Sequence, residues 1–127
     1  MDTNNELPLT LIAKEANSTV TLTKTGNPNV SGLKYKTNND NDWNDYTIDT
    51  VITLPNINNY VQFKNINTTL SSNNNYVQFT MTGIIESYGT IQSMLNYVSV
   101  CKPYCFQRLF ENCSSLIKAP ELPSMNL

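Results

Sequence analysis

The pentapeptide NYVQF occurs twice in this chain, at residues 59–63 and again at residues 75–79. In both copies Val and Phe alternate with Tyr and Gln, so the two apolar side chains share one face of an extended strand. The second copy continues to Met81, which extends its apolar face. The repeat predicts two similar strands that both bury their Val and Phe side chains.

The same alternation runs through residues 7–82. Thr separates the apolar residues Val20 and Leu22, for example, and Thr53 separates Ile52 from Leu54. Such runs recur about every ten residues between turn-forming clusters, as in antiparallel sandwiches and barrels. We therefore predict a mainly β fold with an Ig-like antiparallel β-sandwich over residues 1–83. The side chains expected between its two sheets are Val20, Leu22, Val61, Phe63, Val77 and Phe79.

The hydrophobic period changes after Gly83. Apolar residues fall at helical spacing over residues 91–98 and again over residues 106–113, which predicts two short amphipathic helices. A short strand is expected after Cys113, because the apolar pair Leu116-Ile117 precedes a proline. The second part of the chain therefore differs from the first in its predicted structure.

The C-terminal segment also carries a specific pattern, with a helix, Cys, Leu and Pro in that order. Its residues are Cys105, Leu109-Phe110, Asn112-Cys113, Ser115-Leu116 and Ala119-Pro120-Glu121-Leu122-Pro123. The segment resembles one repeat of the BspA-like leucine-rich repeats found on bacterial surface proteins, including those of gut Bacteroidetes. Residues 30–63 more loosely resemble the β-sandwich modules that precede such repeats. The resemblance implies that residues 84–127 form a helical connector and a first repeat, with the array continuing beyond Leu127.

A single leucine-rich repeat cannot cover its own apolar face, because each repeat buries that face against its neighbours. The residues expected to pack in this way are Phe106, Leu109, Phe110, Cys113, Leu116 and Leu122. Further repeats, the sandwich or another subunit must cover them. We expect residues 91–127 to pack against neighbouring protein, while residues 1–83 fold without them.

The resemblance implies a non-enzymatic attachment protein that sits in a larger protein assembly. The N-terminal MDTNNELPLT lacks the basic start and apolar core of a signal peptide. We therefore expect a phage virion surface protein, of the head-fibre or decoration type, whose repeats face outward toward a host or glycan ligand. A bacterial cell-surface adhesin and a carbohydrate-binding accessory domain are the alternatives.

Composition argues against several other functions. The chain has no His, which removes Ser-His and Cys-His catalysis and most zinc sites. We expect no cofactor and no enzymatic activity. Eight basic residues and a net charge of −2 give no basic stripe for nucleic acid. No apolar stretch is long enough to insert into a membrane as a helix.

Two groups of residues remain as candidate sites. Asp40, Asp42 and Asp45 lie close together, but the loop has Asp45 where an EF-hand needs Gly, so calcium is a weak candidate and a polar hairpin tip is favoured. The aromatic residues Trp43, Tyr60 and Tyr76 could form a sugar-binding platform if the Tyr face of the two NYVQF strands is exposed. Packing of these rings against a partner or the other sheet is the alternative.

Overall fold

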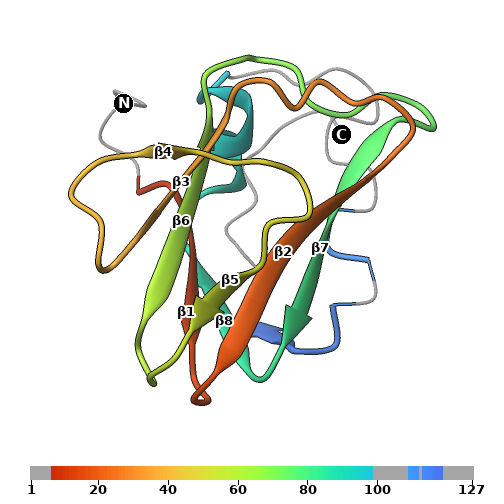
Figure 1. Cartoon of the computed structure of the whole chain (residues 1–127). Helices are drawn as coiled ribbons and strands as arrows, with labels where there is room; N and C mark the ends of the chain where they lie inside the picture. Colours follow the sequence, from red (N-terminus) through yellow and green to blue (C-terminus); the bar gives the residue numbers. More distant parts are fainter. Residues whose placement is uncertain (1–6, 99–108, 112, 119–127) are drawn as a thin grey trace.

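The computed structural model describes residues 7–98, 109–111 and 113–118 and shows two β-sheets packed face to face (Figure 1). The larger sheet has the strand order β4-β3-β6-β1-β8-β9 and the smaller has the order β5-β2-β7. The strands are β1 (Leu9–Ala13), β2 (Ser18–Thr25), β3 (Leu33–Thr37), β4 (Asn44–Asp45), β5 (Ile52–Leu54), β6 (Tyr60–Asn65), β7 (Tyr76–Thr82), β8 (Ile85–Tyr88) and β9 (Leu116–Lys118). All strand pairs are antiparallel except β8 with β9. The predicted mainly β fold with two sheets is therefore confirmed.

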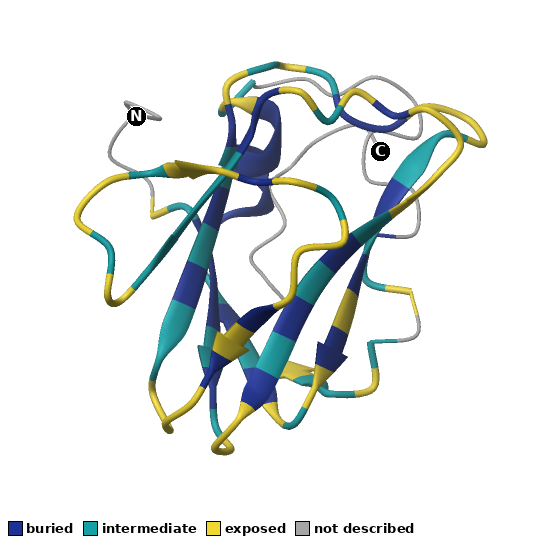
Figure 2. Ribbon diagram, viewed as in Figure 1, coloured by how far each residue is buried: buried dark blue, intermediate teal, exposed yellow. Residues whose placement is uncertain are grey.

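The core lies between the sheets and follows the alternation of the sequence. Figure 2 shows buried and more exposed residues alternating along β2, β6 and β7. The six side chains predicted for the core are at most 1% exposed. Met81 continues the buried face of β7 as expected. Period-2 patterning was sufficient to identify this core, because adjacent side chains on a strand point to opposite faces.

A row of aromatic rings crosses the core from one sheet to the other. Neighbouring ring centroids are 5.2–5.8 Å apart, and the first three contacts are edge-to-face, the geometry that aromatic pairs favour. In order, the rings are Tyr35, Tyr46, Phe63, Phe79 and Phe110. The row includes the Phe of each NYVQF copy, so the two copies meet across the sandwich.

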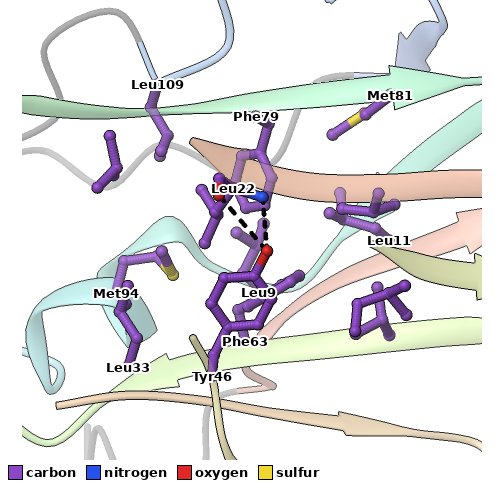
Figure 3. Close-up of a cluster of buried hydrophobic side chains, with 14 of the residues drawn as sticks. Leu9, Leu11, Leu22, Leu33, Tyr46, Phe63, Phe79, Met81, Met94 and Leu109 are labelled. Carbon is purple, nitrogen blue, oxygen red and sulfur yellow. Dashed lines mark hydrogen bonds between the residues drawn. The ribbon is translucent and has the colours of Figure 1, made fainter. Parts of the chain in front are cut away.

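Tyr46 also joins the sheets through its hydroxyl group (Figure 3). This oxygen accepts a hydrogen bond from the Leu22 amide at 2.8 Å and donates one to the Thr50 carbonyl at 2.6 Å. Burial raises the pKa of the Tyr46 hydroxyl, and the hydrogen bond with Leu22 opposes that shift in part. The side chain is 5% exposed, so these bonds satisfy a polar group inside the core.

The boundary predicted at residue 83 falls within the sandwich, between β7 of the smaller sheet and β8 of the larger sheet. Strand β8, directly after it, pairs with β1 along four positions. The next element is a 3₁₀ helix, η2 (Ile91–Leu95), whose Ser93 hydroxyl accepts from the Leu9 amide at 2.9 Å and donates to the Phe63 carbonyl at 2.8 Å. Residues 85–88 and 91–95 therefore pack as part of the sandwich, and the independent folding of residues 1–83 stays a prediction.

The helix predicted over residues 91–98 is only this short 3₁₀ helix. All five of its residues are buried, including the polar Gln92 and Ser93, so it has no solvated face. Left-handed backbone at Asn96 (φ 51°) and Tyr97 (φ 58°) ends it, because such angles cannot continue a right-handed helix. Of the second predicted helix, residues 106–108 and 112 lie outside the described residues, and residues 109–111 form a turn.

Residues 109–111 and 113–118 lie along the open edges of β7 and β8. The Phe79 amide donates to the Leu109 carbonyl at 2.8 Å, and the Cys113 thiol donates to the Phe79 carbonyl at 3.0 Å. The Ile85 amide donates to the Ser115 carbonyl at 2.8 Å, after which β9 pairs with β8. The strand predicted after Cys113 is therefore present, as an added strand of the larger sheet.

The sandwich itself covers the described residues that were assigned to repeat packing. Leu109 is 2% exposed, and Phe110 stacks on Phe79 with centroids 5.2 Å apart. Leu116 is half-buried in β9, and Cys113 is a half-buried free thiol whose pKa is raised by burial. Phe106 and Leu122, like Cys101 and Cys105, lie outside the described residues. Sequence spacing alone could not distinguish packing on a neighbouring repeat from packing on the sandwich.

Candidate functional site

The outer faces of the two sheets differ in chemistry. On the smaller sheet, the cross-strand rows hold Thr almost throughout: Thr53–Thr19–Thr82, Thr21–Thr80, Thr23–Gln78 and Thr25–Tyr76. The Thr19 and Thr82 hydroxyl oxygens are hydrogen bonded at 2.6 Å. These rows form a neutral surface in which most side chains are short and polar.

The outer face of the larger sheet carries charged, aromatic and amide side chains. Strand register places Lys36, Gln62, Thr10 and Tyr88 in one row, and Tyr60, Ile12 and Glu86 in the next. A third row joins Asp45, Lys34 and Lys64 across β4, β3 and β6. Most side chains of these rows are half-buried, since neighbours pack around their stems. This face holds the side chains best suited to contact a ligand.

Trp43 lies against lysines at one end of this face. The Lys64 ammonium is 4.5 Å from the centroid of the Trp43 ring, and the Lys36 ammonium is 5.4 Å from it. Lys34 forms an ion pair with Asp45 on the neighbouring strand. We call Lys34, Lys36 and Lys64 the lysine cluster. Partial burial lowers the pKa of Lys64, and the positive charges of Lys34 and Lys36 lower it further.

The three Asp residues of the loop do not gather around a common point for a metal ion. Asp40 Oδ2 accepts hydrogen bonds from the Thr37 amide at 2.9 Å and the Thr37 hydroxyl at 3.0 Å, which closes the turn after β3. Asp45 is paired with Lys34, and Asp42 is exposed. Over the described ranges, no three acidic or Cys side chains are grouped as metal ligands would be. The arrangement favours the hairpin-tip interpretation of this loop.

The three aromatic residues predicted as a platform do not form one. Trp43 and Tyr60 belong to the larger sheet's outer face, whereas Tyr76 lies on the smaller sheet. A shared platform would need the two NYVQF strands to lie side by side in one sheet, but β6 pairs with β1 and β3, and β7 pairs with β2. Trp43 and Tyr60 therefore remain as one candidate site, and Tyr76 is separate from it.

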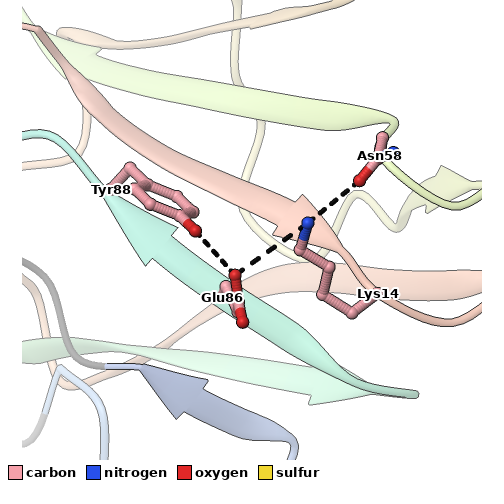
Figure 4. A network of polar contacts seen from close by, with 4 residues as sticks. All are labelled: Lys14, Asn58, Glu86 and Tyr88. Carbon is pink, nitrogen blue, oxygen red and sulfur yellow. Dashed lines mark hydrogen bonds and ion pairs between the residues drawn. The ribbon is translucent and has the colours of Figure 1, made fainter.

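A polar network at the other end of this face was not found from the sequence (Figure 4). The Tyr88 hydroxyl donates to Glu86 Oε1 at 2.7 Å, which raises the pKa of Tyr88. Lys14 lies 3.9 Å from the same Glu86 oxygen and donates to Asn58 Oδ1 at 2.9 Å. The Lys118 ammonium lies 3.5 Å from the centroid of the Tyr88 ring. The alternation IESY at residues 85–88 was the signal that could have indicated a strand with this outer face.

No family model, curated protein or solved structure matches this chain. In the part of the chain that the structure describes, no helix is long and apolar enough to cross a membrane. The candidate site consequently rests on its own geometry.

Proposed function

We propose that this chain is a non-enzymatic attachment module, in which an Ig-like β-sandwich binds its target through the outer face of the larger sheet. The observation that carries the proposal is the contrast between the two outer faces. One has Trp43, Tyr60 and the lysine cluster, and the other is lined by Thr. Aromatic side chains with polar neighbours are typical of binding surfaces, because each ring offers a large contact area at low entropic cost.

The chemistry of this face supports binding rather than catalysis. Two carboxylates close to Trp43 in sequence are engaged, Asp40 with Thr37 and Asp45 with Lys34, and Asp42 beside it is exposed to solvent. A catalytic acid or base must be free to exchange a proton with a reacting group, and Asp45 is already ion-paired with Lys34. The chain also has no His to serve in that role.

We propose further that this module is part of a protein assembly on a virion or cell surface. The resemblance of residues 105–123 to a leucine-rich repeat supports a virion surface protein of the head-fibre or decoration type, with a bacterial cell-surface adhesin as the alternative. In either setting the partners are neighbouring proteins of the assembly and a ligand on the opposing surface. A glycan is favoured as that ligand by the half-exposed Trp43 and Tyr60 beside the polar Gln62.

The test is to measure binding of the labelled full chain to arrayed glycans and to intact bacterial cells. Trp43→Ala and Tyr60→Ala change the proposed face, and Thr21→Ala and Thr80→Ala are the matched controls on the other face. Loss of a central aromatic contact should weaken binding by at least about tenfold, and the Thr variants should bind as the wild type does. Equal loss in both pairs, or undiminished binding by Trp43→Ala, would count against attachment through this face.

A further inference from the structure

The lysine cluster breaks a general rule of sheet design. Lys34 and Lys64 are direct cross-strand partners in the β3–β6 register, and Lys36 follows two residues along on the same face. Like charges placed directly opposite one another destabilise a strand pair. Three of the eight basic residues of an acidic chain are therefore held together where their charges repel. Local rules are most often broken at functional sites, which makes this cluster a candidate for binding an anion.

Charge within the cluster is only partly balanced. Asp45 forms an ion pair with Lys34. Among the described residues, no carboxylate forms an ion pair with Lys36 or Lys64. Those two ammonium groups instead lie near the same Trp43 ring, at 5.4 and 4.5 Å from its centroid. A cation–π contact at a partly exposed site is weaker than a charge-assisted hydrogen bond to a carboxylate. An incoming carboxylate can therefore replace the ring as the partner of both lysines.

The side chains around the lysine cluster indicate what kind of molecule would carry the anionic group. Along β6, the outer face presents Tyr60, Gln62 and Lys64 in succession, and Thr10 lies opposite Gln62 on β1. An aromatic ring, an amide and a hydroxyl beside a cationic pocket suit a ligand with apolar ring faces, hydroxyl groups and a negative charge. Three lysines at one end of the face do not form the long basic track that a nucleic acid backbone needs.

We propose that the lysine cluster, beside Trp43, binds the carboxylate of an acidic saccharide, such as a uronate residue of a surface polysaccharide. This inference rests on the proposed function and specifies its ligand class. The carboxylate lies between the Lys36 and Lys64 ammonium groups, and the adjoining sugar residues extend over Gln62 toward Tyr60. Lys34, already paired with Asp45, positions the loop that carries Trp43. Binding of the anion offsets the repulsion among the three lysines.

The experiment uses isothermal titration of the full chain with an oligogalacturonate and with its methyl ester, which has the same rings but no charge. The acid form should bind at least about tenfold more tightly than the ester, and its affinity should fall as salt rises. Lys36→Gln and Lys64→Gln should each weaken binding of the acid form by about tenfold. Lys24→Gln, which removes the same charge from an exposed position on the smaller sheet, should have no effect.

Folding of the variants is checked by their melting temperatures. Lys64→Gln should melt at the same temperature as the wild type or higher, because a like-charge contact is removed. A variant that binds weakly while remaining folded supports the proposal. An equal loss of affinity in Lys24→Gln, or binding of inorganic sulfate as tightly as the saccharide, would overturn it.

The outcomes also separate this inference from the proposed function. If acid and ester bind equally well and Trp43→Ala weakens both, attachment through this face stands and the acidic ligand is wrong. If neither form binds, the acidic-saccharide inference is wrong, and the glycan and cell measurements decide separately whether the face attaches to anything. If the acid form binds through the lysines but cells bind equally to Trp43→Ala, the attachment function fails.

Discussion

The two NYVQF copies have the same local structure but different surroundings. In each, Val and Phe are buried and the two Phe rings meet at 5.3 Å between the sheets. The copy in β6 lies inside the larger sheet, between β1 and β3, so its Tyr and Gln join the lysine cluster on one outer face. The copy in β7 is the last strand of the smaller sheet, and its Tyr and Gln lie beside Thr residues.

The difference shows which property each level of structure controls. Alternation within the pentapeptide determines which side chains are buried, because it acts through the backbone of a single strand. The neighbouring strands determine what the outward side chains can bind. A ligand site on a sheet is therefore assembled across strands, and identical segments can contribute to it or not.

The largest expected effect tests whether the two Phe side chains are equivalent. Phe63→Ala and Phe79→Ala should each lower the free energy of unfolding by about 3–5 kcal/mol, because both rings are fully buried whatever the position of their strand. Urea denaturation of the full chain measures this. Thr80→Ala, an exposed neighbour on β7, is the control and should change stability by about 0.5 kcal/mol or less. A cost below about 1 kcal/mol at Phe79 would mean that the β7 copy is not part of the core.

The second prediction concerns Leu109, which lies beside β7 in the C-terminal segment. Leu109→Ala should cost about 2–5 kcal/mol, because the side chain is 2% exposed beside the core. Ile117→Ala on the same segment should cost about 0.5 kcal/mol or less, since Ile117 is 60% exposed. Similar small values for both would show that residues 109–118 do not stabilise the sandwich and that β7 has a free edge.

The third prediction concerns Tyr46, whose ring packs against the Phe of the β6 copy. Tyr46→Phe keeps that ring contact but leaves the buried Leu22 amide without its acceptor, so we expect a loss of about 1–3 kcal/mol. Chemical denaturation at neutral pH measures it. A value near zero would indicate that packing alone joins the two sheets at this point.

The raised pKa of the Tyr46 hydroxyl also predicts how the stability of the fold changes at alkaline pH. Burial raises its pKa above the usual value of 10.0, so the unfolded chain releases this proton before the folded chain does. The stabilisation is complete below pH 10.0 and is lost as the pH rises through the higher pKa of the folded state. The melting temperature of Tyr46→Phe should decline less steeply than that of the wild type above this pH. Parallel declines would assign the alkaline loss to other groups.

The smallest effect compares the Gln residues of the two copies. Gln78 Nε2 donates to the Glu111 carbonyl at 2.7 Å, whereas Gln62 Nε2 donates to the Thr10 hydroxyl at 3.3 Å. Gln78→Ala should cost about 0.5–1.5 kcal/mol, and Gln62→Ala less than about 0.5 kcal/mol. Replicate denaturation curves can resolve this difference. The reverse order would mean that the outward Gln of β6 contributes to folding rather than to binding.

The strands and the core could be predicted because both depend on local alternation. The assignment of strands to sheets could not, since the two NYVQF copies are identical and their partners lie far away in sequence. Helical spacing at Ile91, Met94 and Leu95 was misleading for a similar reason. The burial of η2 on all sides depends on contacts such as that of Ser93 with Leu9 and Phe63.

The candidate site was only partly visible in the sequence. Trp43 and Tyr60 were candidate binding residues from the sequence, but the lysines were not. Lys34 and Lys36 alternate with Leu33 and Tyr35, so their outward orientation could have been predicted. That Lys64 lies directly opposite Lys34 follows only from the strand register, which is set by packing and by turns rather than by either segment alone.

The segments 109–111 and 113–115, which lie along β7, also affect how the chain behaves at high concentration. β7 is seven residues long, whereas the terminal strands β4, β5 and β9 have two or three residues each. A long uncovered edge offers free amides and carbonyls that can recruit a strand from another molecule and seed aggregation. The Leu109 carbonyl, the Cys113 thiol and the Ser115 hydroxyl occupy backbone groups of Phe79 and Met81 that would otherwise point outward. Detachment of these segments would therefore expose the β7 edge as a template for intermolecular β-pairing.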